Sequence, residues 1–158
     1  MTVLDLFKTL QASGFGRFVG GLDHLFCALM ELVHIAGMIL LLASVLLVSL
    51  NLFGLGLAGL PPAQLKQSTG KLFWIGLVQL VGSGLLIFSP AATSYYDNDF
   101  FWAKFALLPL ALLVYLTLYR KATTTTATPN RLLVKTTGGL LLSLWLGVAF
   151  AGRFIGFL

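Results

Sequence analysis

The chain has 158 residues, of which 58% are hydrophobic and only 9% are charged, and its mean hydropathy is +0.97. A soluble protein does not have this balance, so most of the chain is expected to lie in lipid. The formal net charge of +5 does not indicate nucleic-acid binding, because the basic residues are scattered at segment ends, and the single cysteine excludes an intrachain disulfide.

The first residues predict a short amphipathic helix. Its apolar residues share one face and its polar residues share the other: Val3, Leu6, Phe7 and Leu10 against Asp5, Lys8 and Gln11. This pattern is typical of a helix that lies in the membrane interface. The alternative is a helical extension of the first membrane span. No cleavable signal peptide is evident.

Four later segments are long and apolar enough to cross a bilayer, which takes about 20 residues. They lie at about 22–53, 72–88, 100–119 and 137–157. The connections between them are a glycine-rich segment at 54–62, an acidic segment at 94–99 and a threonine-rich segment at 123–129. The sequence therefore predicts an all-α, integral membrane four-helix bundle in a single domain of residues 1–158, with a short N-terminal interfacial helix.

The distribution of basic residues predicts the orientation of the bundle. Six lysines and arginines belong to the first-to-second and third-to-fourth connections, and four lie on the opposite side, where the acidic 94–99 connection also belongs. Cytoplasmic loops of membrane proteins carry the excess of Lys and Arg. Both termini are therefore expected outside.

The first span contains an unusual cluster of ionisable residues: His24, Cys27, Glu31 and His34. At 100° per residue these four form one stripe roughly 15 Å long in the outer half of the span. Lys104 enters at a similar depth from the third span, and Arg153 enters from the fourth. Ionisable groups inside a membrane are expensive, so the cluster indicates a functional site by default.

A purely structural interpretation of this cluster is open. Glu31 would pair with Arg153 or Lys104 and lock the bundle, since a carboxylate inside a membrane is satisfied by a cation. His34 would be an ordinary interhelical hydrogen-bonding residue, and His24 would be solvated near the interface.

Two functional interpretations use the histidines as ligands. Four-helix bundles hold cofactors between facing helices, and histidine is a common axial ligand of haem b. Because His24 and His34 belong to one helix, a single chain offers only one of them to a haem, and the second ligand would be Lys104, water or His34 of another copy. A mononuclear copper or zinc site would use His24 and His34 with Cys27 and Glu31.

A third functional interpretation is a quinone or another small apolar ligand bound near the outer surface. Four residues would supply its proton and hydrogen-bond partners: Glu31, His34, Lys104 and Arg153. Histidine and a buried carboxylate are the groups whose pKa values shift most usefully for proton exchange.

Short motifs in the chain resemble those of small bacterial four-helix membrane proteins of unknown function. The motifs are Glu31-Leu-Val-His34-Ile-Ala-Gly37 in the first span, Lys104 opening the third, and Trp145-Leu-Gly147 followed by Gly152-Arg153 in the fourth. The resemblance implies a bacterial inner-membrane protein in which Glu31, His34, Lys104 and Arg153 act together. A remoter resemblance, based on a histidine in an early helix, is to copper-resistance and b-type cytochrome membrane domains. The charged pair that relatives carry after the first span is absent from 49–54 here.

The leading expectation is a small redox-associated inner-membrane subunit that binds haem b or quinone in the outer half of the bundle and takes part in electron transport. The first alternative is a non-catalytic accessory subunit that packs against a larger membrane complex. The second is a small transporter, which is disfavoured because internal repeats and polar residues in the inner halves of the spans are not evident. The expected partners are the lipid bilayer and either further copies of the chain or a larger membrane complex, and nucleic acid is not expected.

Overall fold

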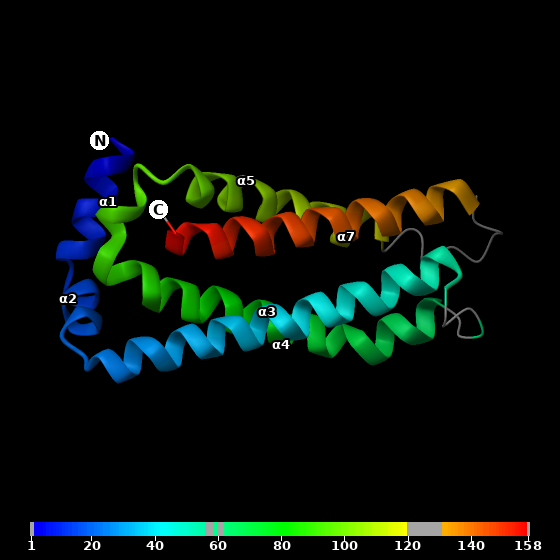
Figure 1. The fold of residues 1–158 in the computed structure, drawn as a ribbon, viewed down its shortest axis with the longest axis horizontal. Helices are drawn as coiled ribbons and strands as arrows, with labels where there is room; N and C mark the ends of the chain where they lie inside the picture. The colour runs from blue at the N-terminus through cyan, green and yellow to red at the C-terminus, as the bar shows by residue number, and fades with distance from the viewer. Residues whose placement is uncertain (1, 56–58, 60–61, 120–130, 158) are drawn as a thin grey trace.

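The computed structural model describes residues 2–55, 59, 62–119 and 131–157. No strand occurs among these residues, and the chain is helical almost throughout (Figure 1). The elements in chain order are α1 (Val3–Ala12), α2 (Gly14–Gly20), α3 (His24–Phe53), α4 (Pro62–Phe88), η1 (Ser89–Tyr95), α5 (Asp99–Val114), η2 (Tyr115–Tyr119), α7 (Arg131–Phe154) and η3 (Ile155–Phe157).

Four helical stretches are long and apolar enough to cross a membrane: His24–Phe53, Gln67–Tyr95, Asp99–Leu118 and Leu132–Phe157. The predicted all-α four-helix bundle is thus confirmed, and the chain has the architecture of a multi-pass membrane protein.

Two of the long helices begin before the predicted spans. The second long helix begins at Pro62 rather than at 72, and the fourth begins at Arg131 rather than at 137. Residues 62–71 are mostly polar and residues 131–136 include Arg131 and Lys135, so hydropathy ends the span where the helix itself continues. Proline is also tolerated in the first turn of a helix, where its missing N–H has no intrahelical partner to lose. The predicted connection at 123–129 and most of the one at 54–62 lie outside the described residues.

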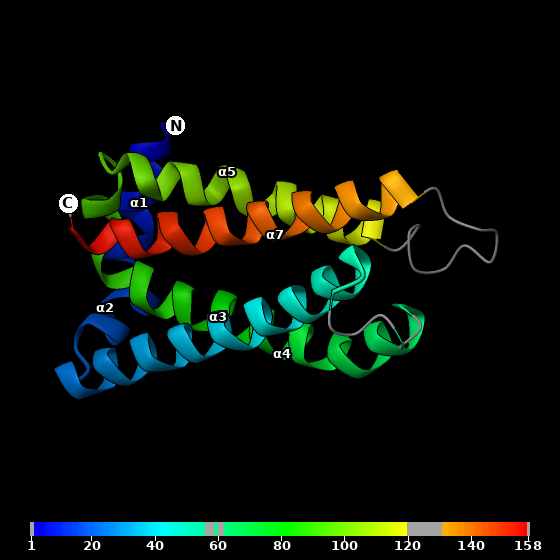
Figure 2. The same cartoon turned by 45° about the vertical axis from the view of Figure 1, so that its right-hand side comes forward.

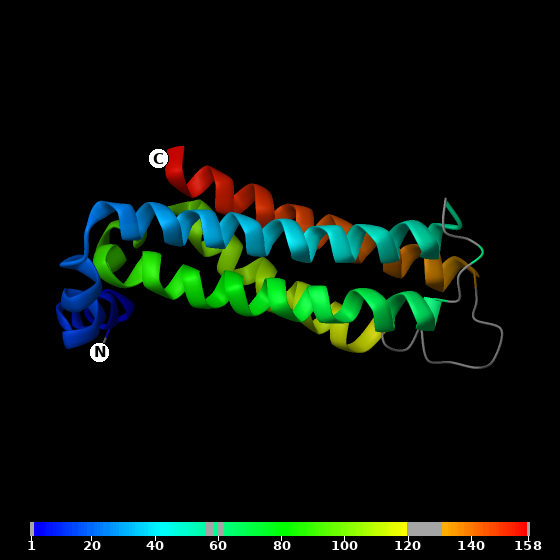
Figure 3. The ribbon, with the colours of Figure 1, turned by 90° about the horizontal axis from the view of Figure 1, so that it is seen from below.

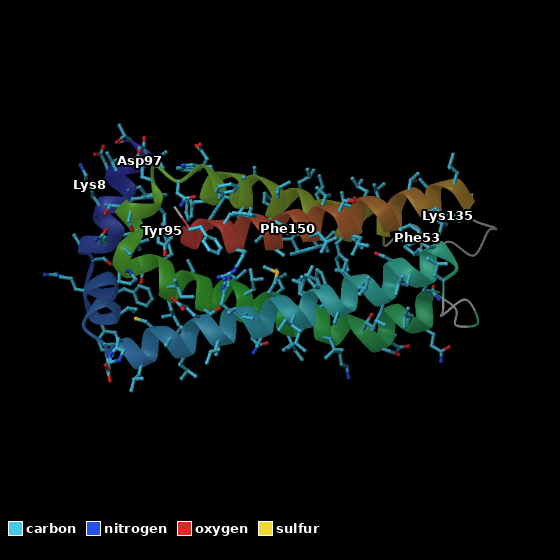
Figure 4. All side chains as sticks on the ribbon, in the orientation of Figure 1. Lys8, Phe53, Tyr95, Asp97, Lys135 and Phe150 are labelled. Carbon is cyan, nitrogen blue, oxygen red and sulfur yellow. The ribbon has the colours of Figure 1, made fainter. Side chains whose placement is uncertain are left out.

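Two helical hairpins make up the bundle. Helix α3 packs along α4, α5 packs along α7, and the hairpins meet mainly where α3 contacts α7 (Figures 1 and 2). Both chain termini lie at one end of the bundle, where α1, α2 and η1 also lie (Figures 1 and 3). We call this the capped end and the opposite one the far end. Figure 4 shows Lys8, Tyr95 and Asp97 at the capped end, and Phe53 and Lys135 at the far end.

Two glycines allow α3 and α4 to approach closely. A Cβ atom on Gly37 would come within 2.9 Å of the Gly76 carbonyl oxygen, and one on Gly76 would come within 2.6 Å of the Gly37 carbonyl oxygen. Only small residues permit such contact between helix backbones. The contact lies three residues from His34 and sets the spacing of α3 and α4 beside that residue.

The centre of the bundle is an aromatic and aliphatic core. Phe73 and Trp145 are fully buried, and the Phe73 ring stacks on Tyr115 with ring centroids 3.8 Å apart. Four buried hydroxyl residues follow toward the far end: Ser44, Ser49, Thr69 and Thr137. The expectation that this half lacks polar residues is therefore wrong. An average hydropathy over a span does not reveal single serine and threonine residues. Such residues are tolerated there because their hydroxyl groups can donate to backbone carbonyls of the same helix.

The predicted N-terminal helix is present as α1, but it lies across the capped end and is not an extension of the first span (Figure 1). Its first turn has a capping box, in which Thr2 and Asp5 each accept a hydrogen bond from the other's backbone N–H. Two hydrogen bonds with Thr2 lower the pKa of the Asp5 carboxyl, and the backbone bond has a larger effect than the side-chain bond. Phe7 is buried and meets Phe88 and Phe101 edge-on, so one ring docks α1 onto the bundle.

Candidate functional site

The polar centre of the capped half is the imidazole of His34 on α3. Lys104 Nζ on α5 lies 3.2 Å from His34 Nε2, and Ser83 Oγ on α4 lies 3.0 Å from His34 Nδ1. Ser83 is buried, while His34 and Lys104 are partly buried. One imidazole therefore joins three helices, and its contact with Lys104 bridges the two hairpins.

The hydrogen bond that Ser83 donates determines which atoms of His34 are donors and which are acceptors. The Ser83 hydroxyl donates its single proton to the Gln79 carbonyl oxygen, so it can only accept from His34. The Nδ1 atom then carries the imidazole proton, and Nε2 presents the lone pair that accepts from Lys104. This assignment follows from the network. It gives a neutral imidazole at the centre of a continuous chain from Lys104 to the Gln79 carbonyl.

Glycines on two helices make room for this chain. A Cβ atom on Gly84 of α4 would lie 3.2 Å from His34 Cε1, and one on Gly152 of α7 would lie 3.3 Å from Lys104 Nζ. A larger side chain at either position would crowd the imidazole or the ammonium group. All four long helices therefore shape the His34–Lys104 site: α3, α4 and α5 supply its side chains, and glycines of α4 and α7 leave the space around them.

The site has a cation but no acidic partner in the part of the chain that the structure describes. The one ion pair in that part joins His24 Nδ1 to Asp23 Oδ1 at 2.7 Å, and both side chains are mostly exposed. His24 begins α3, ten residues before His34, which places the two histidines about 15 Å apart along the helix. The structure therefore does not bring His24 into the site.

Glu31 and Arg153 are also exposed. The Arg153 guanidinium lies over the Phe157 ring, 4.8 Å from its centroid. Among the described ion pairs, none joins Glu31 to Arg153 or to Lys104. Helix α7 diverges from α3 toward the capped end, which accounts for the missing Glu31–Arg153 pair (Figures 1 and 2). No residue of α3 before Gly37 is buried.

The described residues contain no group of three or more His, Cys, Asp or Glu side chains that could hold a metal ion. Cys27 is exposed, like Glu31, so the stripe on α3 is not gathered around one point. His34 and Lys104 are the two sequence-predicted residues that the fold brings into contact, and they are the groups that could hold a cofactor.

Sequence reasoning missed the role of Ser83. It lies in the run Gly82-Ser83-Gly84, which the sequence alone presents as a helix-packing pattern. A serine flanked by glycines also leaves space for a side chain of another helix to reach the hydroxyl group. The Gly-Ser-Gly pattern could therefore have indicated an interhelical hydrogen bond to Ser83, but it does not identify the partner residue.

Comparison with known proteins gives a match to one family model. The model, described as a family of unknown function (DUF6644), matches residues 6–158. No curated protein matches the chain, and no solved structure matches it.

Proposed function

Because the chain belongs to DUF6644, a family of unknown function, its role must be argued from its own residues, and we propose that it is a small redox-associated subunit that binds a quinone. The quinone would be held at the capped half by Lys104 and His34. The observation that supports this is the hydrogen bond between Lys104 Nζ and His34 Nε2, which lies in the capped half of four helices able to span a membrane.

The chemistry of the pair suits a ligand with a carbonyl oxygen. An ammonium group has three donor hydrogens, and His34 accepts only one from Lys104. Because no carboxylate in the described residues pairs with Lys104, the other hydrogens are available to a ligand. A quinone is apolar enough to reach this depth through lipid, and its oxygens accept hydrogen bonds. The chain would orient the quinone. Reduction to the quinol takes two electrons, which a redox partner subunit would supply, and two protons from the aqueous side, one of which would pass through Lys104.

The geometry favours a quinone over haem b. Iron ligation needs a free imidazole nitrogen, yet both nitrogens of His34 are hydrogen-bonded, to Ser83 and to Lys104. Haem binding would have to displace Lys104 first. His24 cannot serve as the opposite ligand of the same haem, because it lies about 15 Å away on the same helix.

A binding titration tests the proposal. The full chain is reconstituted into quinone-free vesicles, and quenching of its tryptophan fluorescence is followed as a short-tailed benzoquinone is added. Lys104→Met should weaken binding by about tenfold or more, because a charge-assisted hydrogen bond is lost. Lys135→Met is the matched control, since Lys135 is an exposed lysine at the far end. Equal affinity of the two variants would overturn the proposal.

An absorption spectrum with metal analysis separates the two cofactors. A purified sample without a Soret band, which still binds the benzoquinone, supports the quinone site. A Soret band that is lost in His34→Ala would instead establish haem b, with His34 as its ligand.

We further propose that the far end faces the cytoplasm of a bacterium and that both termini lie outside the inner membrane. Helix α3 and η2 end at the far end, and α4 and α7 begin there. In the sequence, the ranges 51–71 and 119–135 carry six Lys and Arg and no acidic residue, whereas all five acidic residues lie elsewhere. Basic loop residues favour the cytoplasmic side. A reporter fused to the C-terminus that is active only in the periplasm tests this orientation.

The exposed start of α3 favours a second candidate, a non-catalytic accessory subunit in a larger membrane complex. Residues 24–36 contain no buried residue, although they include Glu31 and Cys27. Another membrane protein or a further copy of this chain could cover that stretch. Crosslinking from Cys27, the single cysteine of the chain, would identify such a neighbour, and lipid adducts alone would argue against one.

A further inference from the structure

Helix α7 carries a shallow groove on a face separate from the His34–Lys104 site. The groove has a volume of about 230 Å³ and is lined by Leu146, Ala149, Phe150 and Arg153. The spacing of these residues, three, four and seven along the helix, places them on one face and makes the lining about 10 Å long. Gly152, which faces Lys104, is rotated about 100° from Arg153. The same turn of α7 therefore serves two different surfaces.

The groove is apolar along its length and cationic at one end. Leu146 and Phe150 are exposed hydrophobic residues, while Arg153 lies in the last turn of α7, toward the capped end. The Phe157 ring lies 4.8 Å below the guanidinium carbon, which holds the planar group at the end of the groove. No carboxylate in the described part of the chain forms an ion pair with it.

We propose that this groove binds a membrane phospholipid, with an acyl chain along Leu146 and Phe150 and its phosphate on Arg153. A guanidinium group binds phosphate through two parallel hydrogen bonds, which a lysine cannot reproduce. The groove and a membrane lipid have the same order of polarity. The apolar part of the groove lies nearer the middle of the bundle, where acyl chains lie, and Arg153 lies nearer the capped end, where a headgroup would lie. Arginines near the ends of membrane helices reach the headgroup layer in this way.

Native mass spectrometry of the delipidated full chain tests the proposal with three probes. Phosphatidylglycerol has both phosphate and acyl chains, diacylglycerol has the chains alone, and glycerophosphate has the phosphate alone. The first should give a saturable single adduct, and the other two should not. Tight binding of diacylglycerol would overturn the role of Arg153, and tight binding of glycerophosphate would overturn the role of the groove.

Two variants and a matched control complete the experiment. Arg153→Gln and Ala149→Trp should each lower the occupancy by phosphatidylglycerol by about tenfold, since one removes the phosphate partner and the other fills the groove. Arg17→Gln removes an exposed arginine of α2 outside this groove and should leave the occupancy unchanged. Equal occupancy in Arg153→Gln and Arg17→Gln would overturn the proposal, with circular dichroism used to confirm that each variant is folded. The benzoquinone titration is independent, because it depends on Lys104.

Discussion

At the scale of single residues, the stability of the capped half of the bundle depends on whether each polar atom of His34 has a hydrogen-bond partner. The imidazole uses Ser83 as its acceptor and Lys104 as its donor, and the Ser83 hydroxyl is itself satisfied by the Gln79 carbonyl. A polar atom left unpartnered in an apolar interior destabilises a protein more than a paired one stabilises it. The network around His34 should therefore respond to small changes at Ser83.

Ser83→Ala should lower the free energy of unfolding by roughly 1–3 kcal/mol, because His34 Nδ1–H loses its acceptor. Ser68→Ala is the control, since Ser68 lies on the same helix and also donates to the carbonyl four residues earlier, but is exposed. Unfolding by SDS in detergent micelles measures both variants. Equal losses would mean that the Ser83 hydroxyl matters only within its own helix.

Residue chemistry predicted this site only in part. The cost of ionisable groups in a membrane singles out His34 and Lys104, and the fold brings these two together. The same reasoning selects Glu31 and Arg153, yet both are exposed. Helical periodicity places residues on a face of their own helix, but it does not say where two helices diverge.

At the scale of helices, the α3–α4 hairpin is fixed by the contact of two backbones. Gly37 and Gly76 lie opposite each other, and a Cβ atom on either would overlap a backbone oxygen of the other. Backbone atoms cannot move aside as a flexible side chain can, so the helices themselves would have to separate.

Gly37→Ala should destabilise the bundle by about 1–3 kcal/mol, the usual range for overpacking. Gly82→Ala is the matched control, because a Cβ atom there meets nothing within 4 Å. Alanine is the better helix former, so this control should be neutral or more stable by up to about 1 kcal/mol. Thermal unfolding in detergent compares the two, and a neutral Gly37→Ala would contradict the close packing.

At the scale of the whole molecule, the N-terminal residues cover one end of the bundle. Phe7 from α1 enters an aromatic cluster formed by the end of α4, η1 and the start of α5. Gln11 adds a polar contact, because its Oε1 accepts from the Thr93 hydroxyl at 2.7 Å and from the Thr93 backbone at 3.0 Å. A buried ring and a side-chain amide thus both attach α1 to the bundle.

Phe7→Ala should release α1 from the bundle, because removing a buried phenyl ring costs about 3–5 kcal/mol. The mobility of a spin label at Lys8→Cys, in a Cys27→Ser background, should rise sharply. Phe15→Ala is the control, since that ring is 48% exposed, and it should leave the mobility of the label unchanged. Unchanged mobility of the label in Phe7→Ala would mean that the docking of α1 does not depend on this ring.

The sequence by itself determined that this is an all-helical membrane bundle with four spans and an amphipathic N-terminal helix. Hydropathy and helical periodicity are properties of consecutive residues, so no contact between helices is needed to recognise them. The tertiary structure alone decided that His34 meets Lys104 and Ser83, while Glu31 and Arg153 stay apart. Which side chains meet depends on helix crossing and divergence, and these follow from close contacts such as Gly37 with Gly76, between residues distant in the chain.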